Sequence, residues 1–349
     1  MTKDTPSKKP SDKSGYASSF DVAARAGVSR SAVSRTFTDG GSVSAKTREK
    51  VLKAAAELGY SPSVFPKMML TRKSALIALV VGGLEHPDYA VAVETFALMA
   101  QEMGSRILLF AVKDVQYMDA VIPTILPYRV DAIISALAMR SPETAATCAS
   151  MGIPVVLFNG KVRNKFVASI CCDNVTGGRG IAEIFVANGA SRFAYIGLPD
   201  NNLPSQERLA GYAGYLMANG SSGMLIENGN YSYESGYEAA VRLMRTKSPP
   251  DAIFCANDLM AIGAMEAIRF EFGLDVPTDV KVAGFDNIPM AAWPSHQLTT
   301  ARQNVQLMVQ EALEVLTIML RDGSPDAGIL RVTPSEIIER KSSGTRSIN

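Results

Sequence analysis

Cationic and hydroxyl side chains gather near the N-terminus, where the four Arg and Lys residues of segment 29–48 alternate with serines and threonines. Guanidinium, ammonium and hydroxyl groups bind the phosphates and base edges of nucleic acids. Residues 1–73 hold 14 of the 35 Lys and Arg residues but only 6 of the 34 Asp and Glu residues, so this part carries a net charge of +8 and the rest one of −7. A basic head on an acidic body indicates a nucleic-acid-binding module joined to a second domain.

Residue patterns for catalysis and metal binding are absent from the sequence. It contains no G-x-S-x-G, no P-loop and no H-E-x-x-H, and its two histidines, His86 and His296, have no partnered nucleophile. The four cysteines lie in apolar runs without metal-ligand spacing, which is typical of free core thiols in a reducing cytosol. We therefore expect that the protein is not an enzyme and that it has neither a metal site nor a cofactor.

The sequence shows neither a secretory signal nor a membrane span. The first residues contain no apolar core of a signal peptide, and no run approaches 18 uninterrupted apolar residues. Residues 1–17 are rich in Ser, Lys, Pro and Asp, which predicts a disordered tail whose lysines are an alternative source of the basic charge. We expect a cytoplasmic protein with no membrane contact.

Short helices must position the basic cluster. Helical spacing of apolar residues, a serine before each later helix and a glycine after the first and third predict three helices, Phe20–Ala26, Arg30–Thr36 and Ala45–Leu58. The first two have helix-turn-helix spacing within an all-α unit over residues 18–60. The exposed start of the second helix can enter a major groove, where the donor and acceptor pattern distinguishes every base pair.

From residue 75 onward, apolar strand-like runs alternate with longer helical segments. The runs are Leu76–Val81, Arg106–Val112, Val130–Leu137, Ile153–Phe158, Phe193–Leu198, Ala252–Cys255 and Val280–Phe285. Continuous apolar strands separated by helices predict a doubly wound α/β body with parallel sheets. The number of alternations exceeds one sheet, so we expect two lobes that divide near residues 159–173, with a segment after residue 298 that returns between them.

The head resembles a known family of bacterial regulators. "DVAARAGVSRSAVSRTF" followed by "VSAKTREKVLKAAAELGYSP" is similar, nearly residue for residue, to the DNA-binding headpiece of the LacI/GalR (lactose-repressor) family. The family pattern is matched except for Ala32 at the usual threonine. The resemblance implies a transcriptional regulator, a repressor by this reading, that binds a pseudo-palindromic DNA operator in the bacterial cytoplasm at the nucleoid.

By this resemblance the second helix reads the operator. The implied base-reading residues are Arg30, Ser31, Ala32 and Arg35. Hydroxyls, cations and helix starts are better suited to phosphate, and the implied phosphate contacts are Ser29, Ser34, Ser44, Lys46, Thr47 and Arg48. The alternative for Arg30 is a phosphate contact, because half or more of protein–DNA hydrogen bonds go to the backbone.

Residues 61–74 resemble the family's hinge linker, with departures. Met69 takes the position of the leucine wedge that enters the minor groove, and Leu70 follows it. Pro66 replaces an alanine of the pattern. A proline is tolerated in the first turn of a helix but costs about 3 kcal/mol in its interior, so formation of a hinge helix is left open.

Residues 75–340 resemble the regulatory domain of the family and the periplasmic sugar-binding proteins. The landmarks are "SQERLAGY", "FCANDLMAIGAMEAI" and "VAGFDN", each at a strand end or helix start. They imply a cleft that binds a small-molecule effector, a sugar or sugar derivative, through Arg208, Asn257 and Asp286. Weaker candidates are Tyr89, Asn159 and Tyr231. Each has an ordinary alternative: an ion pair for the arginine, a helix cap for Asn257, a turn carboxylate for Asp286, core packing for the tyrosines.

The resemblance also implies an assembly. Two headpieces that read a pseudo-palindrome require a homodimer, and residues 341–349, expected to be flexible, lack the leucine heptads of tetrameric relatives. The competing class is a solute-binding protein of the periplasmic sugar-binding type without a DNA role. The basic headpiece and the missing signal peptide argue against that class.

Overall fold

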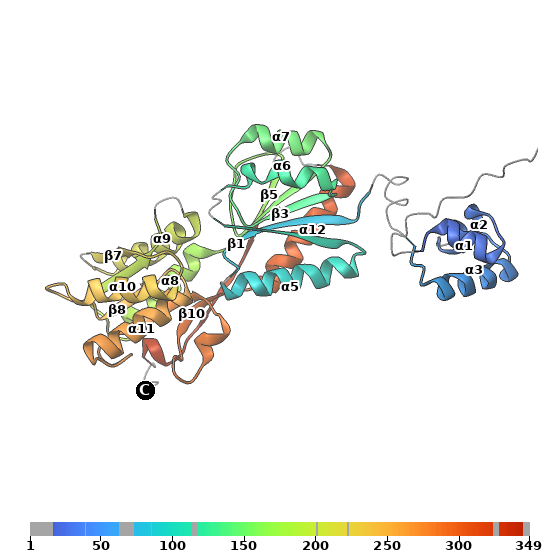
Figure 1. Ribbon diagram of the computed structural model, residues 1–349. Helices are drawn as coiled ribbons and strands as arrows, with labels where there is room; N and C mark the ends of the chain where they lie inside the picture. Colours follow the sequence, from blue (N-terminus) through green and yellow to red (C-terminus); the bar gives the residue numbers. More distant parts are fainter. Residues whose placement is uncertain are drawn as a thin grey trace, which may run out of the picture. The chain divides into compact units, whose positions relative to one another are not determined.

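The structure is a computed structural model that describes residues 17–38, 40–62, 73–84, 86–113, 117–199, 202–221, 223–323 and 328–344. Two compact units, the head and the body, divide between Lys73 and Ser74 (Figure 1). The predicted tail up to residue 16, the hinge residues Pro66, Met69 and Leu70, and residues 345–349 lie outside the described residues.

The described part of the head contains the helices α1 (Ser19–Ala26), α2 (Arg30–Thr36) and α3 (Ala45–Leu58). Local signals set each boundary. The hydroxyls of Ser18, Ser29 and Ser44 each accept a hydrogen bond from a backbone N–H of the first turn that follows. Gly27 and Gly59 end α1 and α3 in the left-handed conformation, with φ of 66° and 60°, which glycine adopts at no steric cost. The predicted helices are confirmed.

A small apolar core holds the three helices of the head together. Val22, Val33 and Val51, one from each helix, are fully buried. Phe37 and Tyr60 close the core, with ring centroids 5.6 Å apart. Because this core needs only one face of α2, the opposite face is free to meet a partner.

The first lobe of the body is a parallel sheet with helices on both faces. Its strand order is β11-β5-β4-β3-β1-β2. The strands are β1 (Leu76–Gly82), β2 (Arg106–Val112), β3 (Ala132–Ser135), β4 (Val155–Phe158), β5 (Val167–Cys172) and β11 (Ile329–Thr333). Helices α5 (Pro87–Glu102) and α12 (Val305–Asp322) cover one face, and α6 (Ile122–Ile125) and α7 (Pro142–Ser150) cover the other (Figure 1).

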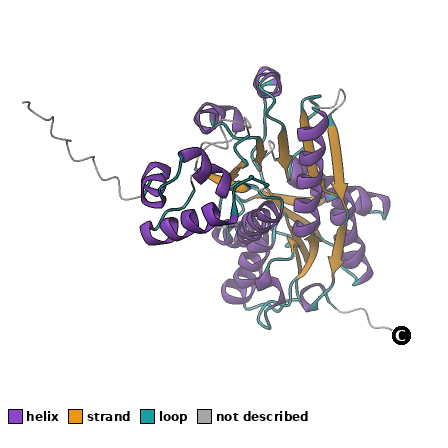
Figure 2. Ribbon diagram, turned by 90° about the vertical axis from the view of Figure 1, so that its right-hand side faces the viewer, coloured by secondary structure: helices purple, strands orange, loops and turns teal. Residues whose placement is uncertain are grey.

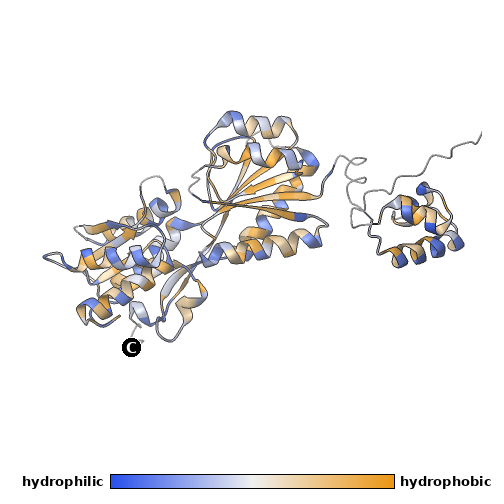
Figure 3. Ribbon diagram, viewed as in Figure 1, coloured by the Kyte–Doolittle hydropathy of each residue, from blue (hydrophilic) through white to orange (hydrophobic). Residues whose placement is uncertain are grey.

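The second lobe repeats this architecture with strand order β12-β10-β9-β8-β6-β7. Its strands are β6 (Phe193–Gly197), β7 (Met224–Asn228), β8 (Ala252–Cys255), β9 (Lys281–Asp286), β10 (Thr299–Gln303) and β12 (Ser335–Ile338). Its helices are α8 (Asn174–Ala187), α9 (Leu203–Ala218), α10 (Tyr233–Met244) and α11 (Asp258–Phe272). Helices lie around the strands in Figure 2, and the strands of the first lobe are apolar along their length in Figure 3.

The chain passes between the lobes at three places. It passes from β5 into α8, from β10 into α12 and from β11 into β12. The division predicted for residues 159–173 therefore falls at its C-terminal end, and the predicted return segment after residue 298 is confirmed. The predicted doubly wound parallel sheets are confirmed. The edge strand β12 pairs antiparallel with β10, because the chain re-enters the second lobe directly, without a crossover helix.

Some sequence predictions concern side chains rather than elements. All four cysteines are buried and free, as predicted from their apolar surroundings. In the described part of the chain, no helix is long and apolar enough to cross a membrane.

Candidate DNA-binding surface and ligand cavity

The start of α2 presents the predicted base-reading side chains. Arg30, Ser31 and Arg35 are exposed. The Ser29 hydroxyl accepts from the Ala32 N–H at 3.2 Å and lies 2.9 Å from the Ser31 hydroxyl, so these serines form a capped first turn. The Arg35 Nε donates to the Ser31 carbonyl at 3.2 Å, which holds this side chain along the helix.

Two residues predicted to contact DNA also have structural positions. Ala32 is only 9% exposed, which leaves little of its methyl group for a base edge, and its role in base reading stays a prediction. The Arg48 guanidinium donates to the carbonyls of Thr36 at 3.0 Å and Gly41 at 3.4 Å, which ties the loop after α2 to α3. Arg48 is nevertheless exposed, and its contact with phosphate stays a prediction.

The other predicted phosphate ligands lie at the surface of the head. Ser34 and Lys46 are exposed, and Ser44 is exposed as the cap of α3. The Ser44 and Thr47 hydroxyls lie 2.8 Å apart. Capping uses one lone pair of the Ser44 oxygen, and one hydroxyl proton suffices for the bond between Ser44 and Thr47, so this pair can cap the helix and still donate one hydrogen bond to a phosphate.

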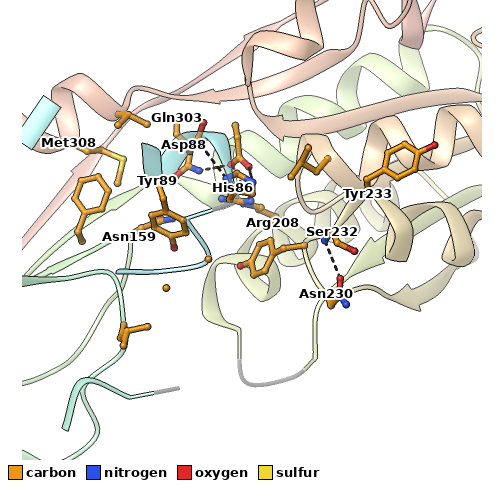
Figure 4. A pocket seen from close by; sticks show the side chains of 18 of the residues that line it. His86, Asp88, Tyr89, Asn159, Arg208, Asn230, Ser232, Tyr233, Gln303 and Met308 are labelled. Carbon is orange, nitrogen blue, oxygen red and sulfur yellow. Dashed lines mark hydrogen bonds and ion pairs between the residues drawn. The ribbon is translucent and has the colours of Figure 1, made fainter. Parts of the chain in front are cut away.

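A cavity of about 500 Å³ lies between the two lobes of the body. Side chains from both lobes line it, among them Asp88, Tyr89 and Asn159 from the first lobe and Arg208, Tyr231 and Asp286 from the second (Figure 4). The carboxyl ends of β1, β4, β6 and β9 lead into this region, which is where a parallel sheet collects polar groups.

Arg208, on α9, is 2% exposed and lines the cavity. Its Nε donates to Asn174 Oδ1 at 2.9 Å and its Nη1 to the Ala256 carbonyl at 2.5 Å. The guanidinium carbon lies 3.7 Å above the Phe285 ring, and Nη1 lies 3.6 Å from Asp286 Oδ1. These contacts fix the orientation of the guanidinium in the cavity wall.

Asp286 joins the two lobes. It lies at the end of β9 with φ of 112°, a strained conformation of the kind found at functional sites. Its Oδ1 accepts from Gln303 Nε2 at 2.5 Å, and its Oδ2 lies 3.3 Å from Nε2 of His86, which belongs to the first lobe. The contact between His86 and Asp286 therefore links the lobes across the cavity.

Asn257 is not among the residues that line the cavity, and its role as an effector ligand stays a prediction. It is fully buried and caps α11, where its Oδ1 accepts from the Met260 N–H at 3.0 Å. Its Nδ2 donates to the Tyr231 carbonyl at 2.9 Å and lies 3.1 Å from His86 Nε2. These partners use both the oxygen and the NH2 group of the amide, which is the helix-cap role that was the alternative for this residue.

The weaker candidates Tyr89, Asn159 and Tyr231 all line the cavity. Asn159 and Tyr231 have φ of 61° and 74°, so both hold their side chains on a strained backbone. Burial raises the pKa of Tyr89 and of Tyr231 well above the ordinary value, so both phenols are neutral. The Asn159 Oδ1 is buried without a hydrogen-bond partner among the described residues.

Sequence reasoning missed His86, Asp88 and Gln303. His86 has a side chain only 12% exposed and caps α5, its Nδ1 accepting from the Asp88 N–H at 3.4 Å. Asp88 and Gln303 both line the cavity. The signal was present, since Gln303 ends a strand and Asp88 follows one, but neither position carried a family motif.

Burial and neighbouring charges perturb the acid–base groups of the cavity. Burial and the charge of Asp286 raise the pKa of Asp88 to about 8. Burial lowers the pKa of His86, but the hydrogen bond and the charge of Asp286 outweigh it and raise this pKa above its ordinary value. The shared carboxylate of Asp286 therefore raises the pKa of both groups.

One group of described side chains has the donor types for a metal ion. Ligand atoms of His86, Asp88 and Asp286 all lie within 4.8 Å of one another. The Arg208 guanidinium already neutralises Asp286, and both ring nitrogens of His86 face polar groups of the protein. We assign no metal to this group.

A helix-turn-helix head on a two-lobed α/β body with a polar cavity between its lobes defines a class of DNA-binding regulator with a ligand-binding domain. The comparisons with known proteins agree. The family model "Bacterial regulatory proteins, lacI family" matches residues 20–63, and the model "Periplasmic binding protein-like domain" matches residues 182–343.

Relatives cover nearly the whole chain. The chain is 30% identical over 331 residues to the HTH-type transcriptional repressor PurR of Pectobacterium atrosepticum, covering 92% of this chain and 95% of the relative. A crystal structure of the Lac repressor dimer bound to operator and the anti-inducer ONPF superposes with a TM-score of 0.83 at 27% identity, covering 95% of this chain and all of the other. The CelR–cellobiose complex gives a TM-score of 0.69 at 28% identity, covering 93% of this chain and 99% of the other. The chain belongs to the LacI family of transcriptional regulators, and these relatives are regulators rather than enzymes.

Proposed function

We propose that this protein is a sequence-specific transcriptional repressor whose operator binding is controlled by a small molecule, a sugar or sugar derivative, bound between the lobes. It acts as a homodimer on a pseudo-palindromic operator in the bacterial cytoplasm. The relatives support this proposal, because one is named a repressor, one is a dimer bound to operator and one is a cellobiose complex.

The observation that carries the proposal is the pairing of groups across the cavity. Asp286 of the second lobe contacts His86 of the first, and the Arg208 guanidinium adjoins the same carboxylate. A ligand that binds Asp286 changes a contact between the lobes, so its affinity differs between lobe arrangements. Only such differential affinity can shift a conformational equilibrium.

For the DNA contacts we propose Arg30, Ser31 and Arg35 as base-reading residues and place Ser29, Ser34, Ser44, Lys46 and Thr47 on phosphates. Arg30 carries most of the specificity, because its guanidinium can donate two hydrogen bonds to guanine while Ser31 is short. We further propose Met69 and Leu70, in the hinge, as minor-groove contacts.

The experiment selects DNA sites for the full chain from a random-sequence duplex library and measures binding by gel shift at several salt concentrations. We expect inverted half-sites and an affinity that falls steeply with salt, because phosphate contacts release counterions. Binding that ignores salt, or selected sites without symmetry, would contradict the proposal.

The ligand arm of the experiment adds sugars, polyols and their derivatives to the selected DNA complex. We expect one of them to change operator affinity, and the variant Asn159→Gly to lose that response while it retains DNA binding. Glycine suits the positive φ of this position, so folding is preserved. Glu94→Gln, on the exposed side of α5, is the control and should behave like the parent chain.

A further inference from the structure

We propose that the ligand of this cavity carries a positively charged nitrogen, as an amino sugar does, which binds between the carboxyl groups of Asp88 and Asp286. This inference rests on the ligand-controlled function proposed above and names the chemistry of the ligand. It assigns to Asp88 a role in selecting the effector.

Two buried acceptors of the cavity wall lack donors. Asp88 Oδ2 and Asn159 Oδ1 are buried, and neither has a hydrogen-bond partner among the described residues. Both belong to the first lobe, at the start of α5 and after the end of β4, and both line the cavity (Figure 4). A buried acceptor without a partner costs about 1 to 3 kcal/mol, so a ligand that fits here has to donate hydrogen bonds.

The charges of the wall favour a cation over an anion. Three carboxyl side chains line the cavity, those of Asp88, Glu234 and Asp286. The one lining guanidinium, that of Arg208, already uses Nε and Nη1 on protein acceptors, and the lining imidazole of His86 already faces Asp286. A sugar acid or sugar phosphate would meet these carboxyl groups, while both cationic side chains among the described lining residues already adjoin Asp286.

The spacing of the acids fits a small cation. An oxygen of Asp88 and one of Asp286 lie within 4.8 Å of each other, a gap in which one ammonium group can donate to both. Without a ligand, a proton on Asp88 relieves the repulsion between the two carboxyl groups, since burial and the neighbouring Asp286 raise the pKa of Asp88 to about 8. A bound ammonium would take the place of that proton.

The rest of the wall suits the ring of a sugar. Tyr89, Tyr231 and Phe158 line the same cavity. Aromatic rings pack against the C–H face of a sugar, and they also attract a nearby cation. Acceptors without partners, paired acids and aromatic rings together match a polyhydroxylated ring that bears an amine.

An organic cation fits this arrangement better than a metal ion. His86, the third potential metal ligand, has Nδ1 turned to the Asp88 N–H and Nε2 turned to Asn257 and Asp286. A metal ion would have to displace the contacts of His86 to use its ring nitrogen, whereas an ammonium group donates hydrogen bonds to carboxylate oxygens and needs no lone pair of the imidazole.

The test measures binding to the full chain by isothermal titration calorimetry. The probes are glucosamine, galactosamine and mannosamine, each beside its parent hexose, its N-acetyl derivative and the corresponding uronic acid. We expect at least one amine to bind about tenfold or more tighter than its three partners, a difference of about 1.4 kcal/mol. In buffers of different ionisation enthalpy at neutral pH, that amine should release a proton, because it displaces the proton held by Asp88.

Variants then locate the effect. Asp88→Asn should weaken binding of the amine about tenfold or more and abolish the proton release, while Glu94→Gln on the exposed side of the same helix should change neither. Tighter binding of a hexose, an N-acetyl sugar or a uronic acid would overturn the proposal. So would no response to any amine, or binding of Zn²⁺ or Mn²⁺ alone that disappears in Asp88→Asn.

The outcome is separable from the proposed function. If this inference fails, operator binding still depends on salt, and the response to a ligand is still lost in Asn159→Gly. Failure of the proposed function removes sequence-specific DNA binding itself, whichever ligand the body binds.

Discussion

Replacing Asp88 by asparagine should stabilise the free protein, and more so as the pH rises. Asparagine has nearly the same shape but cannot ionise, so it removes only the charge that the cavity holds unfavourably. The groups that act on this carboxyl are Asp286 and Asp258, which raise its pKa, and His86 and Arg208, which lower it, in addition to its burial.

The magnitude follows from proton linkage. Folding raises the pKa of Asp88 from 3.8 to about 8, so between these pH values the native chain holds a proton that the unfolded chain has released. The free energy of unfolding therefore falls as pH rises through this window, by about 1.4 kcal/mol per pH unit. From about pH 5 to pH 8 the loss is about 4 kcal/mol in the parent chain, and Asp88→Asn does not suffer it.

The assay is thermal unfolding of the body at a series of pH values, followed by circular dichroism without ligand. One kcal/mol moves Tm by about 2 to 4 °C for a domain of this size, so the Tm advantage of Asp88→Asn over the parent should be about 10 °C larger at pH 8 than at pH 5. Glu94→Gln serves as the control. A Tm difference that is the same at both pH values would refute the reasoning. The cost that Asp88 imposes on the free protein is the cost expected of a group kept for its ligand.

Three further predictions concern the head and the packing of the second lobe. Arg30→Ala should relax sequence preference by about 1 to 3 kcal/mol at one base pair, measured by competition between matched and mismatched operators; equal losses on both would make Arg30 a phosphate ligand. Ser44→Asp should keep the cap of α3, and so its amide-exchange protection, yet weaken operator binding if this position faces a phosphate, whereas Ser44→Ala should lose about 1 kcal/mol of helix stability. Gly178→Ala should lower the stability of the body by about 3 kcal/mol or more in calorimetry, because a Cβ there would lie 2.1 Å from the Arg208 carbonyl oxygen; Gly214→Ala, on α9 with open space around it, should be neutral or stabilising.

The elements of the fold were readable from the sequence because their signals are local. A serine that caps the turn after it and a glycine that ends a helix act over a few residues, so the ends of α2 and α3 were predicted to the residue. The central strand β8 is buried and apolar along its length, and the edge strand β2 is also an apolar run, so both were predicted in full. The edge strands β7, β11 and β12 have half-exposed, mixed sequences and were not predicted, and neither were the buried strands β5 and β10.

The candidate cavity was readable only in part. Arg208 and Asp286 lie in motifs with a family likeness, and the structure places both in the cavity wall. Asn257 lies in such a motif too, yet its amide is spent on capping α11 and on the Tyr231 carbonyl. A motif states which residue type stands at a position, but it does not state which of several partners the side chain binds.

The sequence by itself determined the family, the helix-turn-helix head, the two α/β lobes and the places where polar groups follow strands. Only the tertiary structure decided that His86 bridges the lobes and that Asp88 stands unpaired opposite Asp286. Some 200 residues separate His86 and Asp88 from Asp286 in the chain. Their distance, burial and shared charge arise when two separately folded lobes close on each other, and no pattern along the chain encodes that approach.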